Sequence, residues 1–256
     1  MAVPYQRINL NISDINFKLL IHKYFNDYKT FMNISYLPIP TIEIVNKFAG
    51  TTVAQTKFPV NKTPILQVSK MNSILFQQGM MSVLYHELTH IYDDNMCDFK
   101  VAHRGFHLTP YTEFHATLVQ MMVAMGYDSY FDNKKVSMFD SIHDGNKNTT
   151  FEQYILPETN YNTTCLKIDK NDTKRSFNYL YHLLLYYIGK NYFAQKYILE
   201  DTTHLFDFSL FIKIFGENII FLKDLLYLND NSDNHLVSIA KTQNAIIQEF
   251  DLKYNK

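Results

Sequence analysis

The chain has 256 residues, enough to bury a hydrophobic core without help from disulfides or from a second subunit. Hydrophobic residues make up 46% of it and charged residues 19%, which excludes a disordered chain and a coiled coil. Lys and Arg number 24 against 25 Asp and Glu, and this near-neutral balance argues against nucleic acid as the partner.

Cysteine usage and apolar runs bear on where the protein works. The two cysteines, Cys97 and Cys165, cannot form a disulfide framework, and the N-terminal residues carry no secretory signal, so we expect a cytoplasmic or otherwise intracellular protein. No stretch reaches the roughly 18 consecutive apolar residues of a membrane helix, so we expect no membrane partner. The abundance of Asn, Lys, Ile, Tyr and Phe is typical of an AT-rich genome and is compatible with a phage or mobile element. Nothing in the sequence indicates the oligomeric state.

The N-terminal part of the chain predicts a helix followed by a small sheet. The helix is expected over residues 14–31, where apolar side chains recur at helical spacing: Leu19, Leu20, Tyr24, Tyr28 and Phe31. Residues 36–44 and 64–68 hold β-branched and aromatic side chains between Pro, Gly and Asn, a pattern typical of short strands. We expect the helix to cover the sheet that these strands form.

Two further helices are predicted in the middle of the chain. The first spans residues 73–94, with an apolar stripe of Met80, Leu84, Leu88 and Ile91. A loop is expected up to His107, after which Thr109 and Pro110 read as an N-cap and the first position of the second helix. That helix carries the stripe Leu118, Met121, Met122 and Met125, and Gly126 is expected to end it.

The remainder of the chain predicts loops and then a helical layer. Residues 127–171 are polar, with one short element expected near Tyr154, and helical periodicity returns from residue 173 to the C-terminus. We interpret the aromatic residues of 179–187 and 206–221 as core. The predicted fold is α+β, with residues 1–130 as a catalytic core and the mainly helical residues 131–256 packed on it as one domain.

The sequence His86-Glu87-Leu88-Thr89-His90 is an HExxH motif within the helix predicted over residues 73–94. Histidines at i and i+4 lie on one helical face, so both imidazoles can reach one Zn²⁺ at about 2.1 Å. Glu87 stands beside the first ligand, where it can act as the general base toward an attacking water. A chance match is expected only about 0.012 times in such a chain. We therefore predict one zinc ion per chain.

A catalytic zinc site needs a third protein ligand, and Glu113 is our first choice. It is the only glutamate between Glu87 and Glu152, and Ala116, one turn further along, leaves room for its helix to approach the HExxH helix closely. His103 and His107 compete for this role, because three histidines also make a sound zinc site. These two histidines, Tyr111 and His115 are alternatively donors that stabilise a transition state.

HELTH resembles the active-site motif of the zincin metallopeptidases. HELTH followed by a downstream glutamate resembles the gluzincin branch of these enzymes. Thermolysin-like members have an aspartate four residues after the second histidine, where this chain has Asp94. This resemblance implies that Asp94 orients a ligand imidazole from behind. The segment Tyr-Thr-Glu113-Phe-His-Ala116 also resembles the glutamate helix of intracellular metallopeptidases of the ImmA/IrrE type.

The chain also departs from these patterns. Thermolysin-like enzymes place an aspartate four residues after the ligand glutamate, where this chain has Thr117, so the partner that orients His86 stays unassigned. Ala-His103-Arg-Gly is a distorted form of the segment that supplies the third histidine in SprT-like zincins, which keeps that alternative open.

The resemblance implies a zinc metallopeptidase with a zincin-like fold, Glu87 as general base, and a protein or peptide as substrate. The alternative is a zincin-fold regulatory or virion-associated binding protein that keeps zinc without peptidase activity. The intact Glu87 favours the enzyme, because a purely structural site needs ligands but no base.

Overall fold

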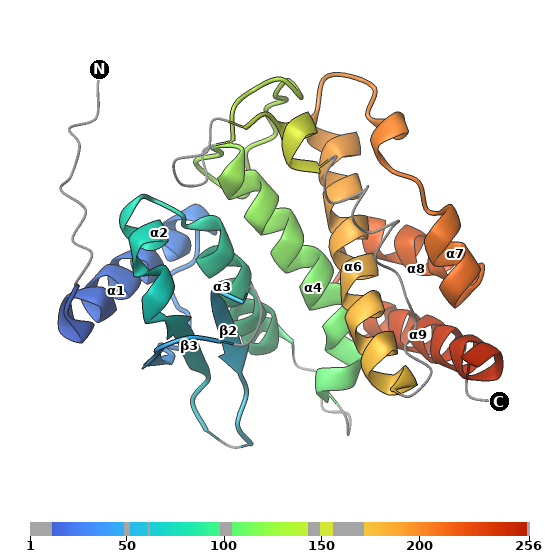
Figure 1. The fold of residues 1–256 in the computed structure, drawn as a ribbon, viewed down its shortest axis with the longest axis horizontal. Helices are drawn as coiled ribbons and strands as arrows, with labels where there is room; N and C mark the ends of the chain where they lie inside the picture. Colours follow the sequence, from blue (N-terminus) through green and yellow to red (C-terminus); the bar gives the residue numbers. More distant parts are fainter. Residues whose placement is uncertain are drawn as a thin grey trace.

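The structure, a computed structural model, describes residues 12–48, 52–60, 62–97, 104–142, 149–155 and 172–254, with the backbone alone for residues 104–107. The mixed α+β class is confirmed: a small sheet and helices α1–α3 lie on one side of α4, and the C-terminal helices lie on the other (Figure 1). The elements are α1 (Asp14–Phe31), β1 (Thr41–Val45), β2 (Ala54–Lys57), β3 (Ile65–Ser69), η1 (Lys70–Asn72), α2 (Ser73–Gln77), α3 (Ser82–Met96), α4 (Arg104–Ala124), α6 (Thr173–Tyr197), η2 (Thr203–Leu205), α7 (Ser209–Phe215), α8 (Asn218–Tyr227) and α9 (Asp233–Tyr254).

Helix α1 has the predicted bounds, and it buries Tyr24, Tyr28 and Phe31 as predicted. Ser13 caps its first turn by accepting a hydrogen bond from the backbone N–H of Asn16. Leu19 is 61% exposed, contrary to the prediction, and the buried side chains also include three that were not predicted: Phe17, Ile21 and Phe25. The helix packs against α2, α3 and β1. The hydroxyl of Tyr28 donates to Thr89 Oγ1 at 3.2 Å, which ties α1 to the HExxH helix.

The sheet has three strands in the order β1-β3-β2, with β1 parallel and β2 antiparallel to β3. Strand β1 starts later than predicted, after Pro38 and Pro40, which have no N–H to offer to a ladder. Strand β2 was not predicted, because Ala-Gln-Thr-Lys lacks an alternating apolar pattern. It is an edge strand, and Thr56 Oγ1 donates to the carbonyl oxygen of Glu87 at 3.0 Å. This contact fixes the edge of the sheet beside the HExxH helix.

The helix predicted over residues 73–94 is two helices, α2 and α3. Gly79 adopts a φ of +89°, a left-handed conformation that glycine reaches without strain, and the chain turns there. Leu84 and Leu88 are buried as predicted, whereas Met80 lies between the helices. The HExxH motif therefore occupies the middle of α3.

Helix α4 begins at Arg104, five residues before the predicted cap, so Pro110 lies inside it. The proline costs one hydrogen bond near the start of the helix, which the rest of its 21 residues outweigh. The predicted stripe of Leu118, Met121, Met122 and Met125 is buried, but side chains on the other faces of α4 are buried as well, because the helix packs between α3 on one side and α6, α8 and α9 on the other. The expectation that His107 lies in a loop is wrong, since its backbone belongs to α4.

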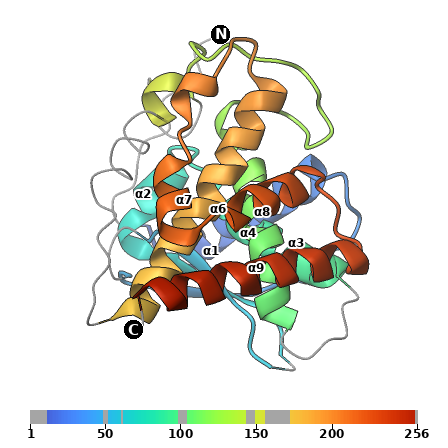
Figure 2. The same cartoon turned by 90° about the vertical axis from the view of Figure 1, so that its right-hand side faces the viewer.

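The C-terminal helices complete the core around α4 (Figure 2). A helical turn at residues 151–155 occupies the place expected near Tyr154. Tyr179 and Phe221 are 53% and 64% exposed, so they do not belong to the core as we predicted. Within the described helices, none combines the length and the hydropathy that a membrane crossing requires.

Gly189 brings α6 unusually close to α4. A Cβ at this position would lie 2.8 Å from Thr117 Cβ and 3.1 Å from the carbonyl oxygen of Phe114, closer than two packed carbons can approach. Glycine therefore sets the distance between the two helices. The residues of α6 that precede Gly189 by one and two turns are thereby held beside the start of α4.

Candidate metal centre

The structure brings together His86, His90 and Glu113, the three ligands predicted first. The two histidines project from α3 and the glutamate from α4, and one ligand atom of each lies within 4.8 Å of the others. Glu113 Oε2 is 3.5 Å from His86 Nε2, and Glu113 Oε1 is 3.8 Å from His90 Nε2. The three side chains could hold a metal ion.

The electrostatics of the group are those of two imidazoles that share one carboxylate. Burial alone disfavours the charge on Glu113, but the neighbouring His90 and His86 outweigh it and lower the pKa of Glu113 to about 2. Burial likewise disfavours charge on His86, yet hydrogen bonding and attraction from Glu113 raise the pKa of His86 overall. The carboxylate of Glu113 therefore favours the charged form of His86.

Two buried atoms of this group, His86 Nδ1 and Glu113 Oε2, make no hydrogen bond of ordinary length and angle with any described residue. A buried polar atom left without a partner is costly, and functional sites are where such atoms concentrate. The unused lone pair of Glu113 Oε2 suits a cation bound between the three side chains.

Two contacts behind the candidate ligands were not predicted. His90 Nδ1 lies 2.9 Å from Thr112 Oγ1, so a hydroxyl of α4 orients this imidazole. Gln120 contributes a hydrogen bond that favours the charged form of His86. Asp94 lines the cleft next to the ligands, and its orienting role stays a prediction.

Helix α6 supplies two side chains that we did not predict, His182 and Tyr186. His182 Nε2 is 3.6 Å from Glu113 Oε1, and the side chain is 46% exposed. The Tyr186 ring lies 5.4 Å from the His86 ring, and burial, Glu113 and Glu87 together raise the pKa of its hydroxyl. Their spacing of i and i+4 on one helical face was visible in the sequence, but nothing local linked that face to residues 86–113.

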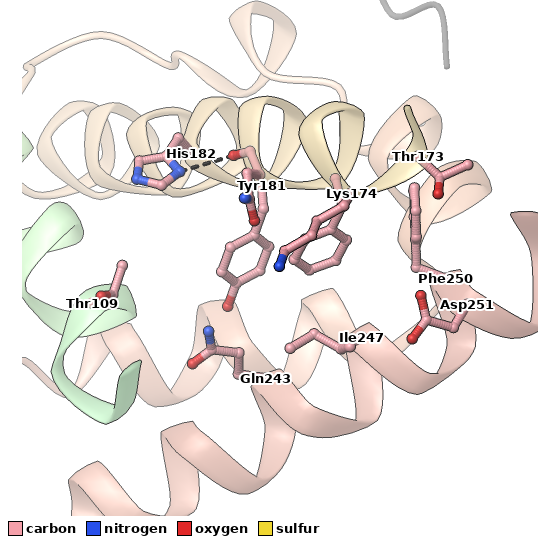
Figure 3. Close-up of a pocket in the computed structure, with 11 residues that line it drawn as sticks. Thr109, Thr173, Lys174, Tyr181, His182, Gln243, Ile247, Phe250 and Asp251 are labelled. Atoms are coloured by element: carbon pink, nitrogen blue, oxygen red, sulfur yellow. Dashed lines mark hydrogen bonds between the residues drawn. The ribbon is translucent and has the colours of Figure 1, made fainter. Parts of the chain in front are cut away.

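The tautomer of His182 follows from its second nitrogen. His182 Nδ1 lies 2.8 Å from the carbonyl oxygen of Asn178, which can only accept, so Nδ1 carries a proton and donates it (Figure 3). Nε2 is then an acceptor in the neutral ring and a donor in the imidazolium. The side chain can therefore pass a proton at Nε2 while Nδ1 stays anchored.

The ligands open onto a cleft of about 1260 Å³. Strand β2 and the segment that follows it form one wall, and α3, α4 and α6 form the others, with Glu87, His182 and Tyr186 on its surface. Glu87 is half-buried and lines the cleft together with the three candidate ligands. A molecule as large as a peptide can reach both the metal ligands and the predicted base.

Two of the other predicted donors, Tyr111 and His115, do not line the cleft. His115 Nδ1 lies 2.7 Å from Asp93 Oδ1, both side chains are buried, and Tyr111 packs against the His115 ring at 5.7 Å. Neither Tyr111 nor His115 is among the described residues that line the cleft. His103 lies outside the described residues, as does the side chain of His107.

No protein-family model matches this chain, and comparisons with curated proteins and with solved structures find no match. The functional interpretation therefore rests on the motif and on the geometry of the site.

Proposed function

We propose that the protein is a zinc-dependent peptidase with a zincin-like active site. The observation that carries the proposal is the convergence of His86, His90 and Glu113 beside Glu87, at the base of an open cleft. Two imidazoles and one carboxylate, with space left on the cleft side, are the donor set of a catalytic rather than a structural zinc site.

The spacing of the donors fits zinc. Two ligands of a tetrahedral zinc ion, each at about 2.1 Å, are about 3.4 Å apart. The separations of 3.5 Å and 3.8 Å from the two histidines to Glu113 are close to that value. Small side-chain movements would bring all three atoms into coordination.

Each side chain in the cleft has a chemical role in this proposal. A bound zinc ion polarises a carbonyl group and acidifies water. Glu87 takes the proton from the attacking water and passes it to the departing amine, which needs no covalent intermediate. Tyr186 stays neutral because of its raised pKa, so its hydroxyl can donate to the oxygen of the scissile carbonyl. His182 does the same through Nε2 when it is protonated.

Strand β2 offers a way to hold the substrate. Among the described strands it pairs only with β3, and Ala54, Gln55 and Thr56 line the cleft. An extended peptide can add to such an edge through main-chain hydrogen bonds, which bind without regard to side chains. This mode of binding favours unfolded segments and loops as substrates.

The test is hydrolysis of an unfolded protein by the zinc-loaded wild type and by Glu87→Gln, with Asn95→Ala as a cleft-lining control. Glu87→Gln keeps the shape of the side chain but cannot take a proton, so we expect the rate to fall by a factor of about 10² or more with zinc retained. An equal rate in Glu87→Gln refutes the mechanism. Absence of cleavage by the zinc-loaded wild type across a broad set of peptides favours the regulatory or virion-associated binding protein.

A further inference from the structure

A second cavity adjoins the cleft. It has a volume of about 650 Å³ and lies between α6 and α9, with the start of α4 at one end (Figure 3). Thr109 and His182 line both this cavity and the cleft. Because His182 Nε2 is 3.6 Å from Glu113 Oε1, the cavity begins one side chain away from the metal ligands.

Aromatic rings form the walls of this cavity. Phe177 stacks on Tyr181 with ring centroids 5.3 Å apart, and it meets Phe250 edge-on at 5.0 Å. Phe215 packs behind both Phe177 and Phe250, so the rings are fixed by the core rather than free to collapse into the space. Rigid aromatic walls favour a flat apolar ligand.

Two polar atoms at the cavity have no hydrogen-bond partner among the described residues. They are Tyr181 Oη and Gln243 Oε1, on side chains that are only 3% and 4% exposed. Figure 3 shows the Tyr181 hydroxyl directed across the cavity toward Gln243 of α9. Burial raises the pKa of Tyr181, so it stays a neutral phenol that can donate, whereas Gln243 Oε1 can only accept.

We propose, on the basis of the peptidase function above, that this cavity binds a tyrosine side chain of the substrate next to the cleaved bond. The tyrosine ring packs against Phe177 and Phe250. Its hydroxyl accepts a hydrogen bond from Tyr181 and donates one to Gln243 Oε1, which satisfies both buried atoms. Phenylalanine has the same ring but leaves both atoms unpaired.

The first test measures binding without catalysis. Titration of zinc-loaded protein with N-acetyl-L-tyrosinamide and with N-acetyl-L-phenylalaninamide, followed by NMR, should show about tenfold or more tighter binding of the tyrosine probe. Tyr181→Phe removes one hydroxyl without a change in packing and should bring the two affinities together.

Blocking the cavity is the second arm. Ile247→Trp fills it and should abolish binding of both probes, whereas Leu252→Trp, on the exposed side of α9, should leave binding unchanged. Equal affinities for the two probes in the wild type, or tyrosine binding that survives Ile247→Trp, overturns the proposal. Thermal melting shows whether each variant folds. If Ile247→Trp does not fold, the affinities of Tyr181→Phe for the two probes decide the test.

Cleavage of a matched peptide series separates this proposal from the one on which it rests. Peptides that differ only in Tyr or Phe beside the cleaved bond should be cut with a tyrosine preference that Tyr181→Phe removes. Cleavage without that preference overturns the tyrosine subsite alone. Probe binding without cleavage of any peptide overturns the peptidase, and the subsite with it.

Discussion

Gly189→Ala is the substitution that most directly perturbs the placement of the α6 side chains. The added Cβ would lie 2.8 Å from Thr117 Cβ, whereas packed carbons rest about 3.5–4.0 Å apart, so α4 and α6 must separate by about 0.7 Å. Overpacking of this kind costs about 1–3 kcal/mol, and the better helix propensity of alanine returns about 1 kcal/mol. The net loss is about 1 kcal/mol, a fall in Tm of about 2–4 °C for a chain of this size.

The same shift should separate metal binding from catalysis. The ligands lie on α3 and α4, so we expect the zinc affinity of Gly189→Ala to stay within about threefold of wild type, less than the effect of losing a contact behind a ligand. His182 and Tyr186 move with α6, and a displacement of this order can lower peptidase activity by about tenfold or more.

Thermal melting, a chelator competition assay and peptide hydrolysis measure the three quantities. Gln195→Ala, an exposed position on the same helix, is the matched control and should change the free energy of unfolding by less than about 0.5 kcal/mol. A rise in Tm for Gly189→Ala with full activity would refute the reasoning, because it would mean that α4 and α6 are not in tight contact.

Four further predictions concern the candidate ligands and the buried residues around them. Zinc must displace the proton held by the raised pKa of His86, so zinc affinity should rise up to about tenfold per pH unit until that pKa is passed. The stability of the metal-free protein should instead fall as pH rises. The stability that a raised pKa provides is present below the unfolded-state pKa and is lost as pH rises through the folded-state value. Melting with EDTA and with zinc checks both predictions. Thr112→Val removes the hydroxyl that orients His90 and should weaken zinc binding about 10–100-fold, measured by chelator competition. Asp93→Ala leaves His115 buried without its partner and should destabilise the protein by about 3–5 kcal/mol, measured by urea unfolding.

The sequence was sufficient to predict that His86, His90 and Glu113 lie together, because the signal is carried by the motif and by the helix that follows it. Two histidines one turn apart on a helix must share a face, and Glu113 was the only nearby glutamate on a predicted helix. The bounds of helix α1 were predicted for the same reason, since the recurring aromatic side chains Tyr24, Tyr28 and Phe31 lie within it.

Features that depend on distant contacts were missed. The break at Gly79 follows from a positive φ, which no periodicity reveals, and strand β2 exists because β3 pairs with it. Helix α4 runs through Pro110 because it is surrounded by other helices, which outweighs the local preference. His182 and Tyr186 are near the ligands only because Gly189 permits α6 to approach α4, and no pattern in the sequence encodes that pairing.

Zinc affinity across a set of ligand variants tests the assignment of the site most directly. We expect one zinc ion per wild-type chain, and a larger loss of affinity in Glu113→Ala than in His103→Ala or His107→Ala. Loss of zinc binding in His86→Ala and in His90→Ala establishes these two histidines as ligands, whichever residue is the third. If Glu113→Ala keeps its zinc and a variant of His103 or His107 loses it, the third ligand is a histidine and the assignment of Glu113 is wrong.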